Sequence, residues 1–302
     1  MKIVFMGSSE FAVPSLKALL EKRYEISAVY TQPPRPAGRG KKLKHVPLAE
    51  YASTKGITIH QPLNFKEPYT AKTLKNYEPD VIVVISYGLL LPTEILSIPK
   101  LLCINVHASL LPRWRGASPI NHAIFSRDDF TGISIIKMVE ELDAGPILNE
   151  KKIALTNTRE YGDLYSELGQ LGAEVLLDTL ERPNLSDMRE QDVSKVTYAP
   201  KIKKEDTKID FNKSAFEIEA KIRGLAPSPG AWFHYRNERL KVYKAIVREG
   251  SGRPGEIIAA NFVIGCGQNL IEVLEIQRPG KSVLKVEEFL KGWNVTKGDF
   301  VN

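Results

Sequence analysis

The fold class is decided by a β-branched run, Asp-Val-Ile-Val-Val-Ile-Ser, at residues 80–86. Runs that stay apolar without alternation are typical of strands buried on both faces of a parallel sheet. Shorter apolar runs lie at residues 3–6 and 26–30, and an alternating strand pattern, Ile-Asn-Val-His, lies at 104–107, with helical patterns between the strands. Strands that alternate with helices predict an α/β fold, a doubly wound and mainly parallel sheet, for the first part of the chain.

The rest of the chain divides at a polar, lysine-rich stretch. We predict a catalytic domain at residues 1–188, a connector at 189–207 and a smaller domain at 208–302. In the last of these, one helix and several short strands separated by turns favour a small β-barrel or a sandwich. The helices that we expect lie at 11–20, 47–55, 71–77, 120–125, 160–180 and 215–225, and the later strands at 133–139, 147–153, 231–235, 240–247, 256–260 and 270–277.

Two polar side chains lie one residue apart at the end of the strand at 104–107. Alternate residues of an extended chain point to the same side, so Asn105 and His107 share a face while Val106 packs on the other. Ligands of open α/β sheets bind beyond the carboxyl ends of the strands. A lone histidine near a strand end is more often structural, but its surroundings here favour a reactive site.

Asp143 is a third candidate, because Leu-Asp-Ala-Gly-Pro at residues 142–146 follows the next predicted strand. An aspartate in a Gly-Pro loop often forms only an Asx turn. In the alternative that we develop, its carboxylate orients His107 or a water molecule. No cluster of ligand-type residues with metal spacing accompanies it, so we predict no metal site.

A basic segment follows the second strand. Its cations are Arg35, Arg39, Lys41, Lys42 and Lys44, and no acidic residue lies among them. Residues 208–302 also hold an excess of positive charge, fifteen Lys and Arg against eleven Asp and Glu. A solvated loop explains the Gly and Pro content, but charge of one sign favours contacts with phosphates.

Several other classes of protein are disfavoured. Gly-Ser-Ser-Glu at residues 7–10 lacks the G-x-G-x-x-G pattern of a dinucleotide site. We expect Cys103 and Cys266 to be buried thiols rather than a disulfide framework. The sequence has no signal-peptide pattern and no apolar run of about 20 residues, which predicts a protein of the cytoplasm, or of an organellar matrix, that does not enter a membrane.

The turn Ser109-Leu110-Leu111-Pro112 has two interpretations. Two large apolar residues after a site strand are usually buried, but they can also form a wall for a flat ring system. Arg113 and Arg115 flank Trp114 next to it, a combination suited to an anionic tail or a nucleic-acid end.

Together these motifs resemble the folate-dependent formyltransferases. The resemblance rests on Asn-Val-His-x-Ser-Leu-Leu-Pro-x-x-Arg-Gly at 105–116, followed by Leu-Asp-x-Gly-Pro at 142–146. Residues 35–42 resemble the tRNA-contacting loop of those members that formylate methionyl-tRNA. Tyr-Ala-Pro-Lys at 198–201 and Pro-Gly-Ala-Trp at 229–232 resemble their connector and C-terminal domain, so the likeness spans essentially the full length. The chain departs from the usual Ala, Gln and Arg at Ser118, Asn121 and His122.

The resemblance implies a Rossmann-like formyltransferase domain with an OB-like C-terminal barrel. It implies formyl transfer from 10-formyltetrahydrofolate to the α-amino group of methionine on initiator methionyl-tRNA, by a protein that we expect to be a monomer. The implied residues are Asn105, His107 and Asp143 for catalysis, Ser109, Leu110, Leu111 and Pro112 for the folate, and Arg35, Arg39, Lys41, Lys42 and Lys44 for the tRNA.

Other activities stay open at this point. A formyltransferase for a small amine, such as a purine precursor or an amino-sugar nucleotide, would share the polar trio but would not need the basic loop. A formyltetrahydrofolate hydrolase, with water as acceptor, would not need it either. A non-catalytic RNA-binding protein would not need Asn105, His107 and Asp143 together.

Overall fold

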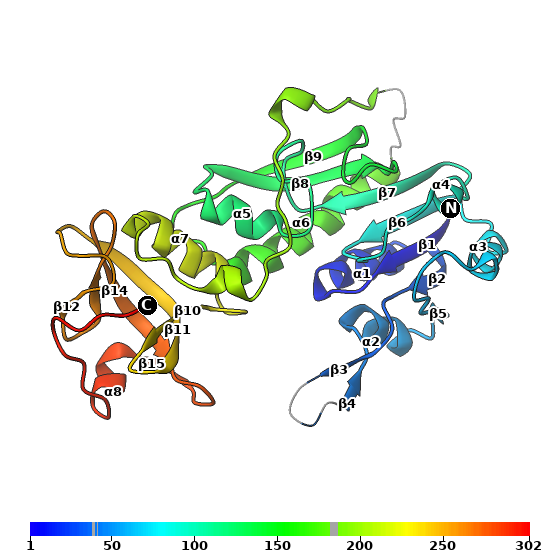
Figure 1. Ribbon diagram of the computed structural model, residues 1–302. Helices are drawn as coiled ribbons and strands as arrows, with labels where there is room; N and C mark the ends of the chain where they lie inside the picture. The colour runs from blue at the N-terminus through cyan, green and yellow to red at the C-terminus, as the bar shows by residue number, and fades with distance from the viewer. Residues whose placement is uncertain (38–39, 41, 182–186) are drawn as a thin grey trace. The chain divides into compact units, whose positions relative to one another are not determined.

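A seven-stranded sheet organises the first part of the chain in the computed structural model, which describes residues 1–37, 40, 42–181 and 187–302 (Figure 1). Its order is β5-β2-β1-β6-β7-β8-β9. Neighbours from β5 to β7 pair in parallel, and β8 is antiparallel to β7. The bounds are β1 (Lys2–Gly7), β2 (Glu25–Tyr30), β5 (Ile59–His60), β6 (Val81–Ile85), β7 (Leu102–His107), β8 (Phe130–Lys137) and β9 (Ile147–Ala154). This confirms the predicted doubly wound, mainly parallel sheet.

The strand order reverses direction between β1 and β6. From β1 the chain adds β2 and β5 on one side, then returns to place β6, β7 and β8 on the other. Reversal points of this kind leave a crevice at the carboxyl ends of the strands, where α/β proteins bind ligands. Asn105 and His107 end the strand beside β6, so the topology brings them next to this point.

Helices cover the sheet. Several of them carry a proline in the first turn, where its missing N–H costs no hydrogen bond. A 3-10 turn (Glu10–Ala12) leads into α1 (Val13–Glu21), and Pro14 lies in the first turn of α1, as predicted. The other helices of this part are α2 (Pro47–Thr54), α3 (Pro68–Lys75), α4 (Thr93–Leu96) and α6 (Tyr161–Glu181). A core that contains Ala71 of α3 and Ile95 of α4 also contains Val4, Ile82 and Cys103 of the sheet.

Alternation along β7 separates its packing side chains from its polar ones. Val106 contacts α6, since a Cβ added to Gly172 of that helix would lie 3.1 Å from Val106 Cγ1. Asn105 is in register with Val84, which belongs to the core on the other face. The sequence prediction that Asn105 and His107 share a face is therefore confirmed.

An antiparallel half-barrel forms the C-terminal part, as predicted. Its strand order is β10-β11-β14-β13-β12, and β15 pairs with β14. The sheet wraps a core of apolar side chains that includes Phe233, Tyr235 and Phe262. The bounds are β10 (Ala231–Tyr235), β11 (Glu238–Arg248), β12 (Ile257–Ala259), β13 (Val263–Gly265), β14 (Leu270–Gln277), β15 (Val283–Lys285), α7 (Ala215–Leu225) and α8 (Val286–Leu290).

Helix α5 (Pro119–Phe125) packs against α7. The buried Asn121 Nδ2 donates a hydrogen bond of 2.7 Å to the Gly224 carbonyl oxygen. Asn121 is one of the positions where the chain departs from the resembled pattern, and this bond gives it a structural role. His122 Nδ1 bonds the Ser118 carbonyl oxygen at 3.0 Å within α5.

The chain packs into two units that interleave in sequence. The first contains Met1–Gly116, Thr131–Ile153 and Tyr165–Tyr198, and the second Ala117–Phe130, Ala154–Leu164 and Ala199–Asn302. Because this division follows packing, the boundaries expected at residues 188 and 207 stay a prediction. Part of the expected connector lies on the first unit, where Arg189 pairs with Ile147 and the amide of Arg115 donates to the Thr197 carbonyl oxygen at 2.9 Å.

Both cysteines are buried and unbridged, as predicted. Burial raises the pKa of the Cys103 thiol to about 12 and, against a backbone hydrogen bond, that of Cys266 to about 12. Both thiols therefore stay protonated near neutral pH and are poor nucleophiles. Among the described helices, none is long and apolar enough to cross a membrane.

Gly7, at the end of β1, sets how closely β1 approaches β6. A Cβ there would lie 2.7 Å from the Ile85 carbonyl oxygen and 3.0 Å from Leu48 Cδ2. We therefore expect Gly7→Ala to lower the free energy of unfolding in urea by about 1–3 kcal/mol through overpacking. The control is Gly292→Ala, because a Cβ at Gly292 would have no atom within 4 Å. Equal stability of the two variants would contradict this account of the β1–β6 contact.

Candidate active site

Asp143 lies at the centre of the predicted polar trio. Asn105 Nδ2 donates to Asp143 Oδ1 at 3.2 Å, and the Gly116 amide donates to Asp143 Oδ2 at 2.8 Å. His107 Nδ1 lies 3.6 Å from Asp143 Oδ2. The structure thus brings together three side chains that the sequence places up to 38 positions apart.

The second nitrogen of His107 determines which of its atoms can exchange a proton. Nε2 lies 2.9 Å from the Trp114 carbonyl oxygen, which can only accept a hydrogen bond, so Nε2 carries the hydrogen. Nδ1 is then the nitrogen that gains or loses a proton, and it faces Asp143. Since His107 is only 5% exposed, its imidazole and the Asp143 carboxylate interact with little screening by water.

Two loops orient the oxygen atoms that face His107, the Trp114 carbonyl and the Asp143 carboxylate. Trp114 has a φ of 67° and Asp143 a φ of 51°, both in the left-handed region. Asp tolerates this region better than most residues, because its short side chain can bond locally. Gly145 allows the second loop to close, since a Cβ there would lie 1.8 Å from the Lys137 carbonyl oxygen.

The turn at 109–112 divides between the interior and the surface of the first unit. Ser109 is buried, and its Oγ donates to the Arg113 carbonyl oxygen at 2.6 Å. Leu111 packs in a small core with Ile136 and Ile147. Leu110 and Pro112 are half-buried, so they are the apolar members of this turn with surface to offer a ligand.

Three exposed apolar side chains lie on neighbouring loops and were not predicted as site residues. Leu90, in the loop after β6, is 80% exposed, and Val139 and Leu142, in the loop after β8, are 39% and 52% exposed. A hydrogen bond from Thr93 to Glu140 joins α4 to the second loop. A sequence signal for these residues exists, because they are apolar residues in loops that follow the strands β6 and β8.

Gln191 and Arg115 are further residues of the site, and Gln191 was not anticipated. Gln191 Nε2 donates to the carbonyl oxygens of Asp143 at 2.7 Å and Gly145 at 2.8 Å. Arg115 Nε donates to Gln191 Oε1 at 3.0 Å. No sequence signal pointed to Gln191, which stands in the polar stretch expected to be a connector.

The basic segment contains a short hairpin, β3 (Arg35–Ala37) paired with β4 (Lys42–Lys44), where we expected an irregular loop. The pairing of β3 with β4 lets this Pro- and Gly-containing segment satisfy backbone hydrogen-bonding groups although it has no apolar core. Arg35 donates to Gln32 Oε1 at 2.9 Å, and the side chains of Lys42 and Lys44 are exposed. Arg39 and Lys41, also predicted to contact tRNA, lie outside the described residues.

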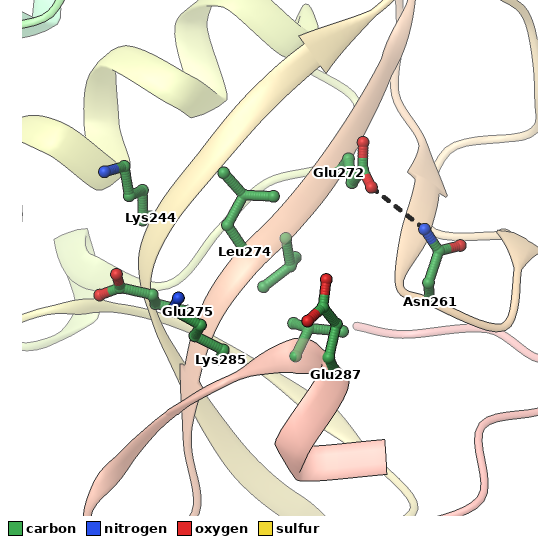
Figure 2. Close-up of a pocket in the computed structure, with 9 residues that line it drawn as sticks. Lys244, Asn261, Glu272, Leu274, Glu275, Lys285 and Glu287 are labelled. Carbon is green, nitrogen blue, oxygen red and sulfur yellow. Dashed lines mark hydrogen bonds between the residues drawn. The ribbon is translucent and has the colours of Figure 1, made fainter.

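A cavity of about 290 Å³ lies elsewhere, in the second unit. Figure 2 shows its charged lining, which includes Lys244, Glu272, Glu275, Lys285 and Glu287. The described residues around it include no histidine, cysteine or serine. It therefore lacks the pairing of an imidazole with a carboxylate that His107 and Asp143 form. Within the described ranges, no three His, Cys, Asp or Glu side chains gather as metal ligands.

Comparison with known proteins agrees with this fold. Residues 1–180 match the family described as formyl transferase, and residues 201–294 match formyl transferase, C-terminal domain. These matches define the class as a formyl transferase of two parts. The methionyl-tRNA formyltransferase of Ruegeria pomeroyi is 42% identical over 299 residues, which are 99% of each chain. The chain therefore belongs to the methionyl-tRNA formyltransferase family.

Solved structures show the same fold at lower sequence identity. The methionyl-tRNA formyltransferase from Clostridium thermocellum has a TM-score of 0.55 at 20% identity, over 90% of this chain and 99% of its own. The N-formyltransferase from Helicobacter canadensis, in complex with folinic acid and dTDP-3-aminofucose, has a TM-score of 0.64 at 19% identity, over 92% and 99%.

Proposed function

We propose that this chain transfers the formyl group of 10-formyltetrahydrofolate to the α-amino group of methionine on initiator methionyl-tRNA. The observation that carries the proposal is the convergence of Asn105 and His107 on Asp143, in a chain of the methionyl-tRNA formyltransferase family. The product would be formylmethionyl-tRNA for translation initiation. This activity would place the protein in the cytoplasm or an organellar matrix.

The chemistry requires stabilisation of an oxyanion and transfer of a proton. When bound, 10-formyltetrahydrofolate supplies the formyl carbon. Attack by the α-amino nitrogen forms a carbon–nitrogen bond and puts negative charge on the formyl oxygen. The negative oxygen then re-forms the carbonyl double bond, and the bond from carbon to the folate nitrogen breaks. Its electron pair leaves with the folate nitrogen, which takes up the proton lost by the amine.

Asn105 and His107 are placed to stabilise the negative oxygen. An amide nitrogen carries two hydrogens, and one of those on Asn105 bonds Asp143. We assign the other to the formyl oxygen, as in an oxyanion hole. His107, protonated on Nδ1, would add a positive charge close to the same oxygen.

We assign the transfer of the amine proton to Asp143. Its Oδ2 faces His107 Nδ1 at 3.6 Å, longer than a hydrogen bond. Such contacts are often loose before the substrate binds and tighten in the reacting complex. The carboxylate can therefore hold the imidazolium in place, or accept the amine proton through a water and pass it to the folate nitrogen.

The exposed apolar residues of the site fit a folate ring. Leu110 and Pro112 would form one wall, with Ser109 and the buried Leu111 supporting it from below. We propose Leu90 and Leu142 as additional contacts, because they are exposed on loops joined by the Thr93–Glu140 bond. A flat apolar ring covering them would remove apolar surface from water.

The β3–β4 hairpin fits a tRNA backbone. Lys42 and Lys44 are exposed on one arm, and Arg35 pairs with Lys44 across the hairpin. We assign phosphate contacts to these three side chains and to Arg39 and Lys41 from the same segment. The density of positive charge favours a polyanionic acceptor over a small amine or water.

A second surface suited to RNA lies on the outer side of β10 and β11. Trp232 and His234 pair across the strands with Lys241 and Arg239, respectively. The Arg239 guanidinium lies 4.4 Å from the centre of the Trp232 ring. Burial, and then the charge of Arg239, lowers the pKa of Lys241. An aromatic ring among crowded cations suits stacking and phosphate contact together.

The direct test of the activity is formyl transfer from 10-formyltetrahydrofolate to methionyl-charged initiator tRNA, measured as acid-stable formylmethionine. We expect turnover with this acceptor, and little with free amines, an amino-sugar nucleotide or water alone. Preference for a small amine would replace the proposal with the small-amine formyltransferase. Folate hydrolysis without an acceptor would replace it with the hydrolase.

Asn105→Ala tests the oxyanion donor. We expect kcat in this assay to fall about 100-fold to 1,000-fold, the usual effect of removing one such donor. The matched control is Asn64→Ala, which changes an exposed loop asparagine. Turnover near that of the unaltered protein in a folded Asn105→Ala variant would remove Asn105 from the mechanism.

Lys42→Ala/Lys44→Ala tests the hairpin. We expect a higher KM for the tRNA, an unchanged KM for the folate, and a slope of log affinity against log salt that is smaller by about 2. The control is Lys17→Ala/Lys75→Ala, which removes two exposed lysines that pair with Glu21 and Glu94. Equal salt slopes in the two double variants would argue against phosphate contacts by the hairpin.

A further inference from the structure

Gln191 holds the backbone of the loop that carries Asp143. Its Nε2 gives one hydrogen to the Asp143 carbonyl oxygen and one to the Gly145 carbonyl oxygen, at 2.7 and 2.8 Å. The side chain is 8% exposed, so water competes little for these bonds. An amide is the side chain that can give two hydrogens from one nitrogen while its oxygen accepts another bond.

Arg115 fixes the other end of Gln191. Its Nε donates to Gln191 Oε1 at 3.0 Å, and one terminal nitrogen donates to Glu141 Oε1 at 3.0 Å. Arg115 is 4% exposed. The next residue, Gly116, donates its amide to the Asp143 carboxylate, so Arg115 and Gly116 touch the Asp143 loop at successive positions.

The loop needs this support because its conformation is uncommon. A left-handed φ for a residue other than glycine persists when the surroundings determine it, and Asp143 has a φ of 51°. The contacts from Asn105 and Gly116 fix its carboxylate, whereas those from Gln191 fix its carbonyl oxygen. Without Gln191 the backbone can rotate, and the carboxylate then loses its direction toward His107.

We propose that Gln191, held by Arg115, is a positioning residue that sets the direction of the Asp143 carboxylate toward His107 and the reacting amine. The inference rests on the proposed function for its kinetic consequence. Its geometric part concerns Asp143 and His107 alone and has a separate readout. Gln191 itself touches the loop backbone and not the substrate.

Two variants separate hydrogen-bond donation from packing. Gln191→Ala removes the side chain. Gln191→Glu keeps its size and its acceptor for Arg115 but loses both hydrogens given to the carbonyl oxygens. The matched control is Arg189→Ala on the same segment, whose side chain is 61% exposed and pairs with Glu150.

We expect both Gln191 variants to lower kcat by about tenfold to a hundredfold, as small misplacements of catalytic groups do. The KM values for folate and tRNA should stay within about twofold of the unaltered enzyme, because Gln191 makes no substrate contact. Arg189→Ala should change none of these.

The second measurement needs no activity. In protein labelled with ¹⁵N-histidine, we expect both Gln191 variants to shift the His107 imidazole resonances, with Arg189→Ala as the reference. A lower melting temperature with unchanged kcat and unchanged His107 resonances would make Gln191 merely structural and overturn the inference. An unaltered chain without formyltransferase activity would refute the proposed function, whereas the His107 resonances would still decide the positioning role.

Discussion

The site depends on one carboxylate, that of Asp143, which accepts hydrogen bonds from Asn105 and the Gly116 amide and faces His107. The groups that meet there come from three segments of the chain. The end of β7 supplies Asn105 and His107, the turn after it supplies Gly116, and the loop after β8 supplies the carboxylate. A shift of any of the three would leave a charged or polar group of this nearly closed site without its partner, which is costly.

The sheet makes this arrangement rigid. β7 lies between β6, in parallel, and β8, in antiparallel orientation, so the strand that carries Asn105 is paired on both sides. Val106 packs against α6 at Gly172, which leaves the two polar neighbours on the opposite face. Rigid strands thus present the donors, while the left-handed Trp114 and Asp143 bring carbonyl and carboxylate oxygens to them.

In the function that we propose, charged surfaces recognise a large acceptor. Exposed lysines on the β3–β4 hairpin and the cation–aromatic face of β10 and β11 offer charge at the surface, where phosphates can reach it. The reacting groups are instead mostly buried, where electrostatic effects are stronger. Formyltransferases that act on acceptors of different size can keep one catalytic centre and differ in the charge of their surfaces. We infer that the positive charge on the surfaces of this chain favours tRNA.

The sequence by itself determined the α/β fold, the shared face of Asn105 and His107 and the two buried thiols, because these follow from local periodicity and apolar content. It also suggested Asp143 from its place after a strand. The contacts of Gln191 could not be predicted, since they join positions 46 to 76 residues apart in a stretch without periodicity. The tertiary structure likewise decided that Leu111 is interior while Leu90 and Leu142 are exposed, because the packing of loops depends on neighbours that no local pattern specifies.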